Sequence, residues 1–422
     1  MKKVNSILND VLEKINPSKE ELKFIKESLE EFKEKLEKRI KENKINAIVF
    51  VGGSFAKGTL IKKKDYDIDI FVRFDLKYKD ENLSKMTANL LKNTAHSVIH
   101  GSRDYFRIKI RHDIFFEVVP VLEVKNPKEA QNITDLSYFH VRYIRQKITD
   151  KISDDIKLAK VFCHANNVYG AESYIKGFSG YALELLIYHY KSFSKFIEVV
   201  SKMKQREIVD IDKLHKDKRT VMLDMNSAKL KSPIILVDPT YRQRNALAAL
   251  SDETFLKFQK VCRDFIKNPS EKFFETKKID FEKEEKDAKK KKYEFVVLTT
   301  KTDRQEGDIA GSKLLKFHKH ISNEIDKFFE IKNSGFEYDD KKSSKSFFAG
   351  KSRKEILLQG PRKELKEYVI GFKKEHKNTF EKSGKIFARE KVNYSIKEFI
   401  KNWKDKNKKK MDEMSIIELG VE

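Results

Sequence analysis

The chain has 422 residues, too many for one ordinary hydrophobic core, and this length predicts two to four domains. Charged residues make up 37% of it, but 31 Phe and 15 Tyr supply enough apolar surface to exclude wholesale disorder. The 90 Lys and Arg against 66 Asp and Glu give a formal net charge of +24, which favours a polyanionic partner, although lysine-rich solvated faces would produce the same excess.

The cysteines and the hydropathy narrow the class of protein further. Cys163 and Cys262 are the only cysteines and form no CxxC pair, which excludes a zinc ribbon or a disulfide scaffold and favours buried thiols in helices. The N-terminus lacks an apolar stretch of signal length, and no run of about 18 apolar residues occurs. We therefore expect a cytoplasmic protein with no membrane contact.

The first predicted domain, residues 1–150, has an α/β pattern with a small mixed sheet. Ser18 and Glu21 have the spacing of a capping box, and the apolar residues from Leu22 to Ile40 then recur every three or four positions. This pattern predicts a long amphipathic helix. Four strands are predicted after it, at residues 47–51, 67–74, 105–110 and 114–121.

Two more domains are predicted, at residues 151–270 and 271–422. The second is helical, with helices at 156–166, 181–200 and 252–266. The third begins with an almost wholly charged stretch, 282–292, which is typical of a solvated loop or linker. A β-α-β-β unit follows, built from a strand at 294–299, a helix at 312–331 and strands near 336 and at 355–358. A basic, mainly helical tail closes the chain.

The most informative stretch of the first domain begins with a turn at Gly53 and Ser54. Because glycine lets a backbone approach closely, such a turn can present N–H groups and a hydroxyl to a phosphate. Asp67 and Asp69 follow on the next strand, where alternation puts both carboxylates on one face. Two aspartates at this spacing, with no other motif nearby, usually lie on a solvated face of a strand. The turn ahead of it favours two divalent metal ions and phosphoryl transfer instead.

This chemistry calls for a third carboxylate on a neighbouring strand. Glu117 lies within the apolar segment 115–120, where an unpaired charge would be costly and a metal ion would remove the cost. Asp113 and Glu123 have the same parity along the strand. Spacing alone therefore does not choose among the three.

Together these residues resemble the class I, archaeal-type CCA-adding enzymes, which are tRNA nucleotidyltransferases of the DNA polymerase β superfamily. The Gly-Ser turn and the two strand aspartates point to the superfamily. Four further motifs point to the archaeal branch, and they lie at 116–120, 167–172, 177–181 and 237–245. The resemblance is dense from residue 45 to 275 and collinear afterwards, including Gly360-Pro361.

The resemblance implies an α+β multidomain fold. It consists of an N-terminal polymerase β-like nucleotidyltransferase head domain with a small mixed sheet, a helical central neck domain, and a C-terminal β-α-β-β body with a helical basic tail that binds tRNA. By the match to the family, two Mg²⁺ ions bind to Asp67, Asp69 and Glu117, and this match is what selects Glu117. The nucleotide contacts implied by the family are Gly53, Ser54, Lys57, Ser137, His140, Lys160, Tyr169 and Arg244.

Several of these residues have plainer interpretations or depart from the family pattern. His140 and Tyr169 have the alternative of core residues, and Lys160 that of a solvated charge; Phe178 and Tyr181 are expected to pack beneath the site. The departures are Lys57 where arginine is common, Glu117 where aspartate is usual, Tyr138 in place of proline, and one extra residue before Asp67. The number of site acids is preserved, which favours an active enzyme.

The resemblance implies the addition of C, C and A from CTP and ATP to the 3′ end of tRNA without a template. The acceptor and TΨC arms would dock on the later domains, with Lys408, Lys409 and Lys410 as the densest basic patch. A solvated, frayed tail is the alternative for that patch, and Trp403 beside it could pack on the body or stack on a base. Other functions compatible with these motifs are a poly(A) polymerase or another RNA 3′-end nucleotidyltransferase, and a catalytically inactive RNA-binding scaffold. A homodimer is compatible with all of them.

Overall fold

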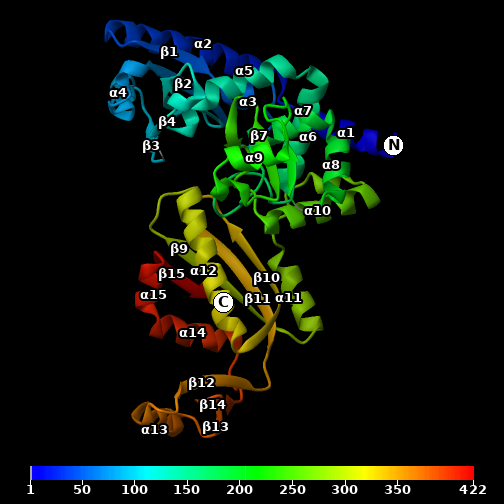
Figure 1. Ribbon diagram of the computed structural model, residues 1–422, viewed down its shortest axis with the longest axis vertical. Coiled ribbons are helices and arrows are strands. Elements are labelled where there is room, and N and C mark those ends of the chain that lie inside the picture. Colours follow the sequence, from blue (N-terminus) through cyan, green and yellow to red (C-terminus); the bar gives the residue numbers. More distant parts are fainter. Residues whose placement is uncertain (1, 102, 205) are drawn as a thin grey trace. The chain divides into compact units, whose positions relative to one another are not determined.

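The fold is described for residues 2–101, 103–204 and 206–422 by a computed structural model. Contacts divide the chain into two compact units, Met1–Lys277 and Lys278–Glu422 (Figure 1). The first unit contains both the predicted catalytic segment and the predicted helical segment. Their division into separate domains stays a prediction.

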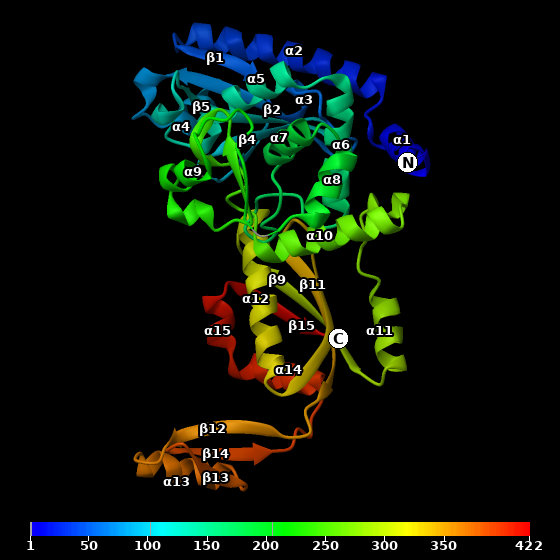
Figure 2. The same cartoon turned by 45° about the vertical axis from the view of Figure 1, so that its right-hand side comes forward.

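The first unit begins with two helices, α1 (Lys2–Ile15) and α2 (Lys19–Glu42). The predicted capping box is confirmed: the Glu21 amide donates to Ser18 Oγ at 3.1 Å, and the Ser18 amide donates to the Glu21 carboxylate at 2.7 Å. The apolar stripe of α2 packs on the sheet that follows, with the Phe32 ring 5.4 Å from the Phe116 ring. Figure 2 shows α2 running along this sheet.

The predicted mixed sheet is confirmed and has five strands in the order β1-β2-β5-β4-β3. The strands are β1 (Ala47–Val51), β2 (Tyr66–Asp75), β3 (Ser97–Ile99), β4 (Tyr105–Arg111) and β5 (Ile114–Glu123). β2 and β5 are parallel, and the other neighbours are antiparallel. Ile68, Ile70 and Phe116 are fully buried on one face, so alternation leaves the other face to the predicted site acids. Between and after the strands lie α3 (Gly53–Ala56), η1 (Leu76–Tyr78), α4 (Leu83–Leu90), η2 (Pro127–Glu129) and η3 (Ile133–Leu136).

The segment after the sheet is built largely from helices around a core of aliphatic residues and phenylalanines. The helices are α5 (Ser137–Lys147), α6 (Asp150–Ala165), α7 (Gly180–Tyr190), α8 (Phe193–Lys202) and α10 (Asp252–Lys267), with η5 (Glu271–Phe273) after them. The single helix predicted at 181–200 is wrong, because Lys191 adopts a left-handed conformation with φ of 68° and Ser192 caps a new helix. Cys163 and Cys262 are buried free thiols in α6 and α10, as predicted.

A small sheet interrupts this helical segment and was not predicted. Its order is β6-β7-β8, from β6 (Glu207–Val209), β7 (Ile234–Asp238) and β8 (Tyr241–Asn245), with α9 (Lys218–Asp224) and η4 (Ser227–Leu230) between β6 and β7. Its strands have three to five residues, and β7 is buried throughout. A short apolar run without alternation cannot be told from a piece of helix.

The second unit contains the predicted β-α-β-β arrangement. Its elements are α11 (Phe281–Lys290), β9 (Glu294–Thr302), α12 (Asp308–Asp326), β10 (Phe329–Tyr338), β11 (Ser343–Ser352), α14 (Ile396–Lys406), α15 (Lys408–Glu413) and β15 (Ile416–Val421). The sheet order is β10-β11-β9-β15, so the end of the tail is a strand rather than a helix. The charged stretch at 282–292 is mostly the helix α11, and the loop prediction there is wrong. The helix predicted to reach residue 331 ends at 326, where β10 follows.

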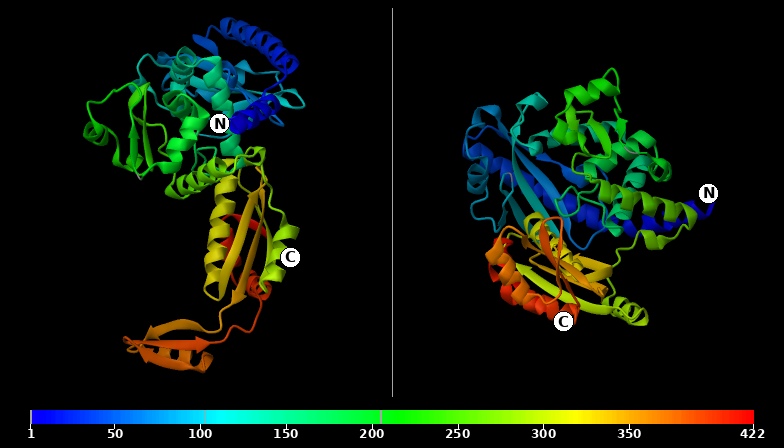
Figure 3. Two further views of the ribbon diagram at one scale, coloured as in Figure 1. Left: turned by 90° about the vertical axis from the view of Figure 1, so that its right-hand side faces the viewer. Right: turned by 60° about the horizontal axis from the view of Figure 1, so that its bottom comes forward.

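A separate small sheet is inserted into the second unit (Figure 3). Its order is β12-β14-β13, from β12 (Ile356–Arg362), β13 (Thr379–Lys382) and β14 (Lys385–Glu390), with α13 (Lys366–Glu375) against it. The strand predicted at 355–358 therefore belongs to this sheet and not to the β-α-β-β unit. Across the described parts of both units, no helix is long and apolar enough to span a membrane.

Candidate active site

The three predicted acids lie on neighbouring parallel strands. Asp67 and Asp69 project from β2, and Glu117 on β5 stands in register with Asp69. Burial raises the pKa of Asp69, and burial together with the charges of Asp69 and Asp67 raises the pKa of Glu117 to about 8. The three carboxylates therefore repel one another across a partly buried face, which a cation would relieve.

The other two acids of the same parity have partners of their own. Asp113 accepts hydrogen bonds from Arg111 Nε at 2.6 Å and Nη2 at 2.9 Å, at the start of β5. Glu123 pairs with Arg73 at 3.3 Å, near the opposite end of the strand. Of the three acids whose spacing is equivalent, Glu117 is the one beside Asp69.

Arg107 on β4 is a site residue that the sequence analysis missed. It stands in register with Glu117, and its Nη2 donates to Asp67 Oδ1 at 2.7 Å. Its Nε is buried without a hydrogen-bond partner, 3.9 Å from Glu117 Oε1. Within the described parts of the chain, no three His, Cys, Asp or Glu side chains are grouped closely enough to hold a metal ion as they stand. The guanidinium brings a positive charge to Asp67 and Glu117. Arg107 alternates with the buried Phe106 and Ile108 along β4, and this alternation is the sequence signal that puts it on the face of the acids.

The Gly-Ser turn fits directly against Asp69. Gly53 opens α3 with φ of 61°, and a Cβ on it would lie 1.7 Å from Asp69 Oδ2. The Gly52 amide also donates to the Asp69 carbonyl at 2.9 Å. The space left by the missing side chain is thus filled by the carboxylate, and Ser54 follows within the same turn.

Lys57 and Lys160, both predicted nucleotide contacts, meet at a buried glutamate that the sequence analysis did not single out. Glu184 of α7 accepts from Lys57 Nζ at 2.6 Å and from Lys160 Nζ at 2.9 Å. Lys160 also donates to the hydroxyl and the carbonyl of Thr59, so internal partners occupy all three of its N–H groups. Despite burial, the two ammonium charges hold the pKa of Glu184 well below its usual range. The sequence signal that could have identified Glu184 is its position as a charged residue within the buried run at 182–187.

A second buried carboxylate, Asp238 at the end of β7, gathers two of the predicted nucleotide contacts, His140 and Arg244. It accepts from Arg244 Nη1 at 2.6 Å, from the Tyr181 hydroxyl at 2.9 Å and from His140 Nε2 at 3.2 Å. The His140 and Tyr181 rings stack with centroids 4.0 Å apart. Burial lowers the pKa of His140. Tyr181 is therefore part of this cluster, whereas it had been expected only to pack beneath the site.

The remaining predicted nucleotide contacts flank these clusters. The Tyr169 ring stacks on the His164 ring with centroids 3.8 Å apart, and its hydroxyl lies 2.8 Å from the position that a Cβ on Gly180 would take. Ser137 is the first residue of α5, three positions before His140. Its neighbour Tyr138 packs on Phe50.

Lys57 links the acids to the Asp238 cluster. It directly follows α3, a helix that contacts both β2, which holds Asp69, and α5, which holds His140. Its positive charge opposes the burial that raises the pKa of Asp69 and adds to the burial that lowers the pKa of His140. Its side chain is 10% exposed, and its ion pair with Glu184 fixes its direction. The first unit therefore contains one continuous polar site, running from the carboxylates through Lys57 to His140 and Arg244.

The predicted RNA-contacting lysines lie in the second unit, on α15. Lys408 and Lys409 are exposed, and Lys410 pairs with Glu413 at 3.1 Å. Trp403 is buried in the core of this unit against Phe317, so it packs on the body. The segment is therefore anchored, and its lysines project from an ordered helix.

The first unit is similar to known nucleotidyltransferases in sequence and in fold. Residues 1–138 match the Second Messenger Oligonucleotide or Dinucleotide Synthetase domain family, and residues 154–275 match the family of the second domain of tRNA nucleotidyltransferase. A cytoplasmic RNA terminal U-transferase superposes with a TM-score of 0.51 at 13% identity, over 66% of this chain and 100% of its own. The Cid1 poly(U) polymerase superposes with a TM-score of 0.51 at 14% identity, over 65% of this chain and 99% of its own. At these identities the likeness is one of fold.

The sequence relatives identify the family of this chain more specifically than the fold does. The CCA-adding enzyme of Nanoarchaeum equitans is 34% identical over 281 residues, which are 66% of this chain and 67% of that enzyme. The CCA-adding enzyme of Thermococcus gammatolerans is 31% identical, over 64% of this chain and 61% of that enzyme. The CCA-adding enzyme of Methanocaldococcus jannaschii is 29% identical, over 93% of this chain and 88% of that enzyme. This match therefore extends into the second unit. The chain therefore belongs to the family of archaeal CCA-adding enzymes, the tRNA nucleotidyltransferases of the DNA polymerase β superfamily.

Proposed function

We propose that this protein adds C, C and A, from CTP and ATP, to the 3′ end of tRNA without a template and releases pyrophosphate at each step. The observation that carries the proposal is the continuity of the site. Acids suited to phosphoryl transfer and a separate buried carboxylate that holds Arg244 and His140 are linked through Lys57 and α3, which contacts the elements on both sides.

We infer that Asp67, Asp69 and Glu117 hold two Mg²⁺ ions. Carboxylate oxygens are the ligands that Mg²⁺ prefers, and the mutual repulsion of these acids supports a cation among them. Arg107 would give up its bond to Asp67 when the ions bind. When bound, the ions supply positive charge for the attacking ribose hydroxyl and for the triphosphate.

The triphosphate would be held by the Gly53-Ser54 turn and by Lys57. Ser54 offers a hydroxyl, and Lys57 offers an ammonium group that Glu184 already orients. Because internal partners occupy all three Lys160 N–H groups, its role would be that of a positioning residue that balances Glu184. Lys57 acts on phosphate as a point charge, without the two-pronged geometry of arginine.

The base would be read by Arg244 and His140, with Ser137 and Tyr169 at the edges of the pocket. Arg244 keeps further N–H groups beyond the bond that it makes to Asp238. Such a site rejects a wrong base because that base leaves buried polar groups unpaired. The Asp238 carboxylate makes the arrangement rigid before the nucleotide arrives.

The RNA partner would be tRNA, docked through its acceptor and TΨC arms. The net charge of +24 and the exposed lysines of α15 support phosphate contacts, and duplex RNA is recognised mainly by shape and backbone.

Incubation of the protein with a tRNA that lacks CCA, and with each nucleoside triphosphate alone, tests the proposal. Addition of two residues from CTP and none from ATP is expected. A long run of A from ATP would instead indicate a poly(A) polymerase. No addition from any nucleotide, with tRNA binding intact, would indicate an inactive scaffold.

A further inference from the structure

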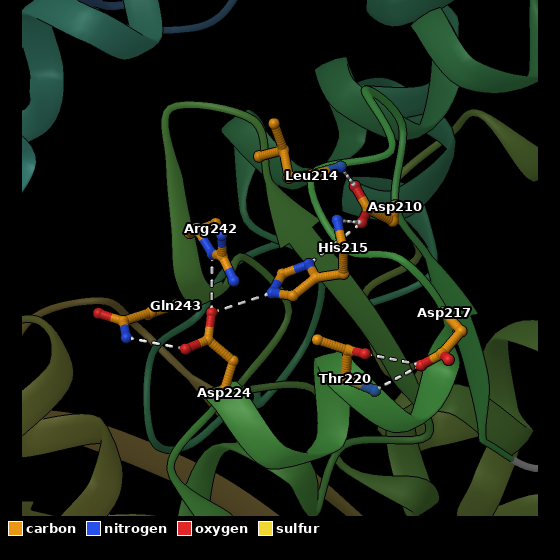
Figure 4. Close-up of polar contacts among 8 residues, drawn as sticks. All are labelled: Asp210, Leu214, His215, Asp217, Thr220, Asp224, Arg242 and Gln243. Carbon is orange, nitrogen blue, oxygen red and sulfur yellow. Dashed lines mark hydrogen bonds and ion pairs between the residues drawn. The ribbon is translucent and has the colours of Figure 1, made fainter.

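A buried histidine lies outside the site described above, between two aspartates (Figure 4). His215 Nδ1 is 3.1 Å from Asp210 Oδ2, and its Nε2 is 3.1 Å from Asp224 Oδ2. The imidazole is fully buried, and the His215 amide also donates to Asp210 at 2.9 Å. Both ring nitrogens of His215 therefore lie within hydrogen-bonding distance of a carboxylate oxygen.

Asp224 connects this histidine to strand β8. Its carboxylate accepts from Arg242 Nε at 2.8 Å and from Gln243 Nε2 at 3.0 Å, in addition to His215. Those bonds, with the charge of Arg242, lower the pKa of Asp224 to about 2. Asp224 ends α9, and a negative charge at a helix C-terminus is unfavourable without compensating donors. The three donors supply that compensation.

Strand β8 needs such support. It is an edge strand whose pairing with β7 is limited to two register positions, separated by an irregularity. Asn245 anchors its far end, because its side chain accepts from the Leu236 amide at 3.0 Å. Between the ends, Arg242 and Gln243 are held by Asp224, and the next residue is Arg244. The bonds to Asp224 therefore set the path of β8, and this path determines where Arg244 meets Asp238.

We propose that His215 and Asp224 form a strut that holds β8 in place and so positions Arg244 for base selection. The inference rests on the proposed function, and it assigns His215 and Asp224 as positioning residues that touch neither substrate. Loss of the strut lets β8 move at its edge, so the nucleotide is bound less tightly and less selectively. The reacting acids on β2 and β5 belong to another sheet and are unaffected.

The first test removes the bonds from the strand side with the double variant Arg242→Ala, Gln243→Ala. Both side chains are exposed, so the variant should fold. KM for CTP and ATP should rise about tenfold, with weaker rejection of GTP and UTP, the size expected for lost hydrogen bonds to a charged group. The turnover number at saturating nucleotide and KM for tRNA should stay within about twofold. A rise in KM for tRNA alone would mean that Arg242 contacts RNA, and would overturn the proposal.

The second test acts from the other side, with Asp224→Asn. The matched control is Asp217→Asn at the N-terminus of the same helix, where asparagine caps as well as aspartate. Asp224→Asn should reproduce the rise in nucleotide KM and the control should not; equal behaviour of the two would overturn the proposal. Calorimetric titration of CTP into both variants decides the inference even if the wild type extends no tRNA, a failure that would count against the proposed function alone.

Discussion

At the scale of single residues, Asp69 is the acid that joins the Gly53 turn to the other predicted metal ligands. It faces Gly53, stands beside Glu117 and is influenced by Lys57. Asp69→Asn should lower the rate of nucleotide addition by about a thousandfold, or about 4 kcal/mol, because metal-binding charge is lost. The affinity for tRNA should stay within about twofold in a filter-binding assay. The control Asp80→Asn changes an exposed acid. A rate within about tenfold of wild type would remove Asp69 from the metal site.

Glu184 carries a second prediction at this scale. Glu184→Gln leaves Lys57 and Lys160 near each other without the carboxylate between them, and breaking a buried ion pair costs about 3 kcal/mol. We expect a lower unfolding temperature and a KM for CTP raised about tenfold, since Lys57 is no longer held. Glu198→Gln on the surface of α8 is the matched control. Equal KM values for the two variants would show that Glu184 has only a structural role.

The sequence predicted the individual chemical groups better than their partners. Asp67, Asp69 and Lys57 stand in local motifs, so the pattern reveals them. Arg107 and Glu184 come from other strands and helices, and their contacts depend on tertiary structure. Asp238 was visible as part of a motif, but its role emerges only when β7, α5 and α7 meet around it.

At the scale of elements, the helix α2 and the strands β1, β2, β4 and β5 were predicted because capping and alternation are local signals. The break at Lys191 was missed because the apolar pattern continues through it. The strand β15 was missed because its partner β9 is over a hundred residues away in the sequence. The solvated helix α11 was missed because a charge run resembles a linker, although pairs such as Lys289 with Glu285 support a helix.

The turn before α3 gives a prediction at the element scale. Gly53→Ala should reduce activity more than about a hundredfold, because its Cβ would displace the Asp69 carboxylate. Gly58→Ala is the matched control: its φ of 68° is also left-handed, but nothing lies within 4 Å of the added Cβ. It should cost about 1 kcal/mol in stability and leave activity intact. Similar activity of the two variants would show that the fit of Gly53 against Asp69 is unimportant.

At the scale of the whole molecule, we propose that the first unit carries out the nucleotide chemistry and that the second unit binds RNA. Neutralising the three lysines at 408–410 should weaken tRNA binding and reduce the slope of log affinity against log salt by up to about three. The rate at saturating tRNA should be unchanged. The control changes Lys33, Lys35 and Lys38 on α2, which removes the same charge from lysines already paired with glutamates. Parallel salt titrations for wild type and the tail variant would mean that α15 stays off the RNA.

In the proposed function, one site selects CTP and ATP and builds a defined 3′ end. The most direct measurement is the mass of a tRNA lacking CCA after complete reaction with CTP and ATP together. We expect a product extended by C, C and A, with no further growth when more enzyme is added. Products of indefinite length, incorporation of one base only, or an unchanged tRNA would contradict it.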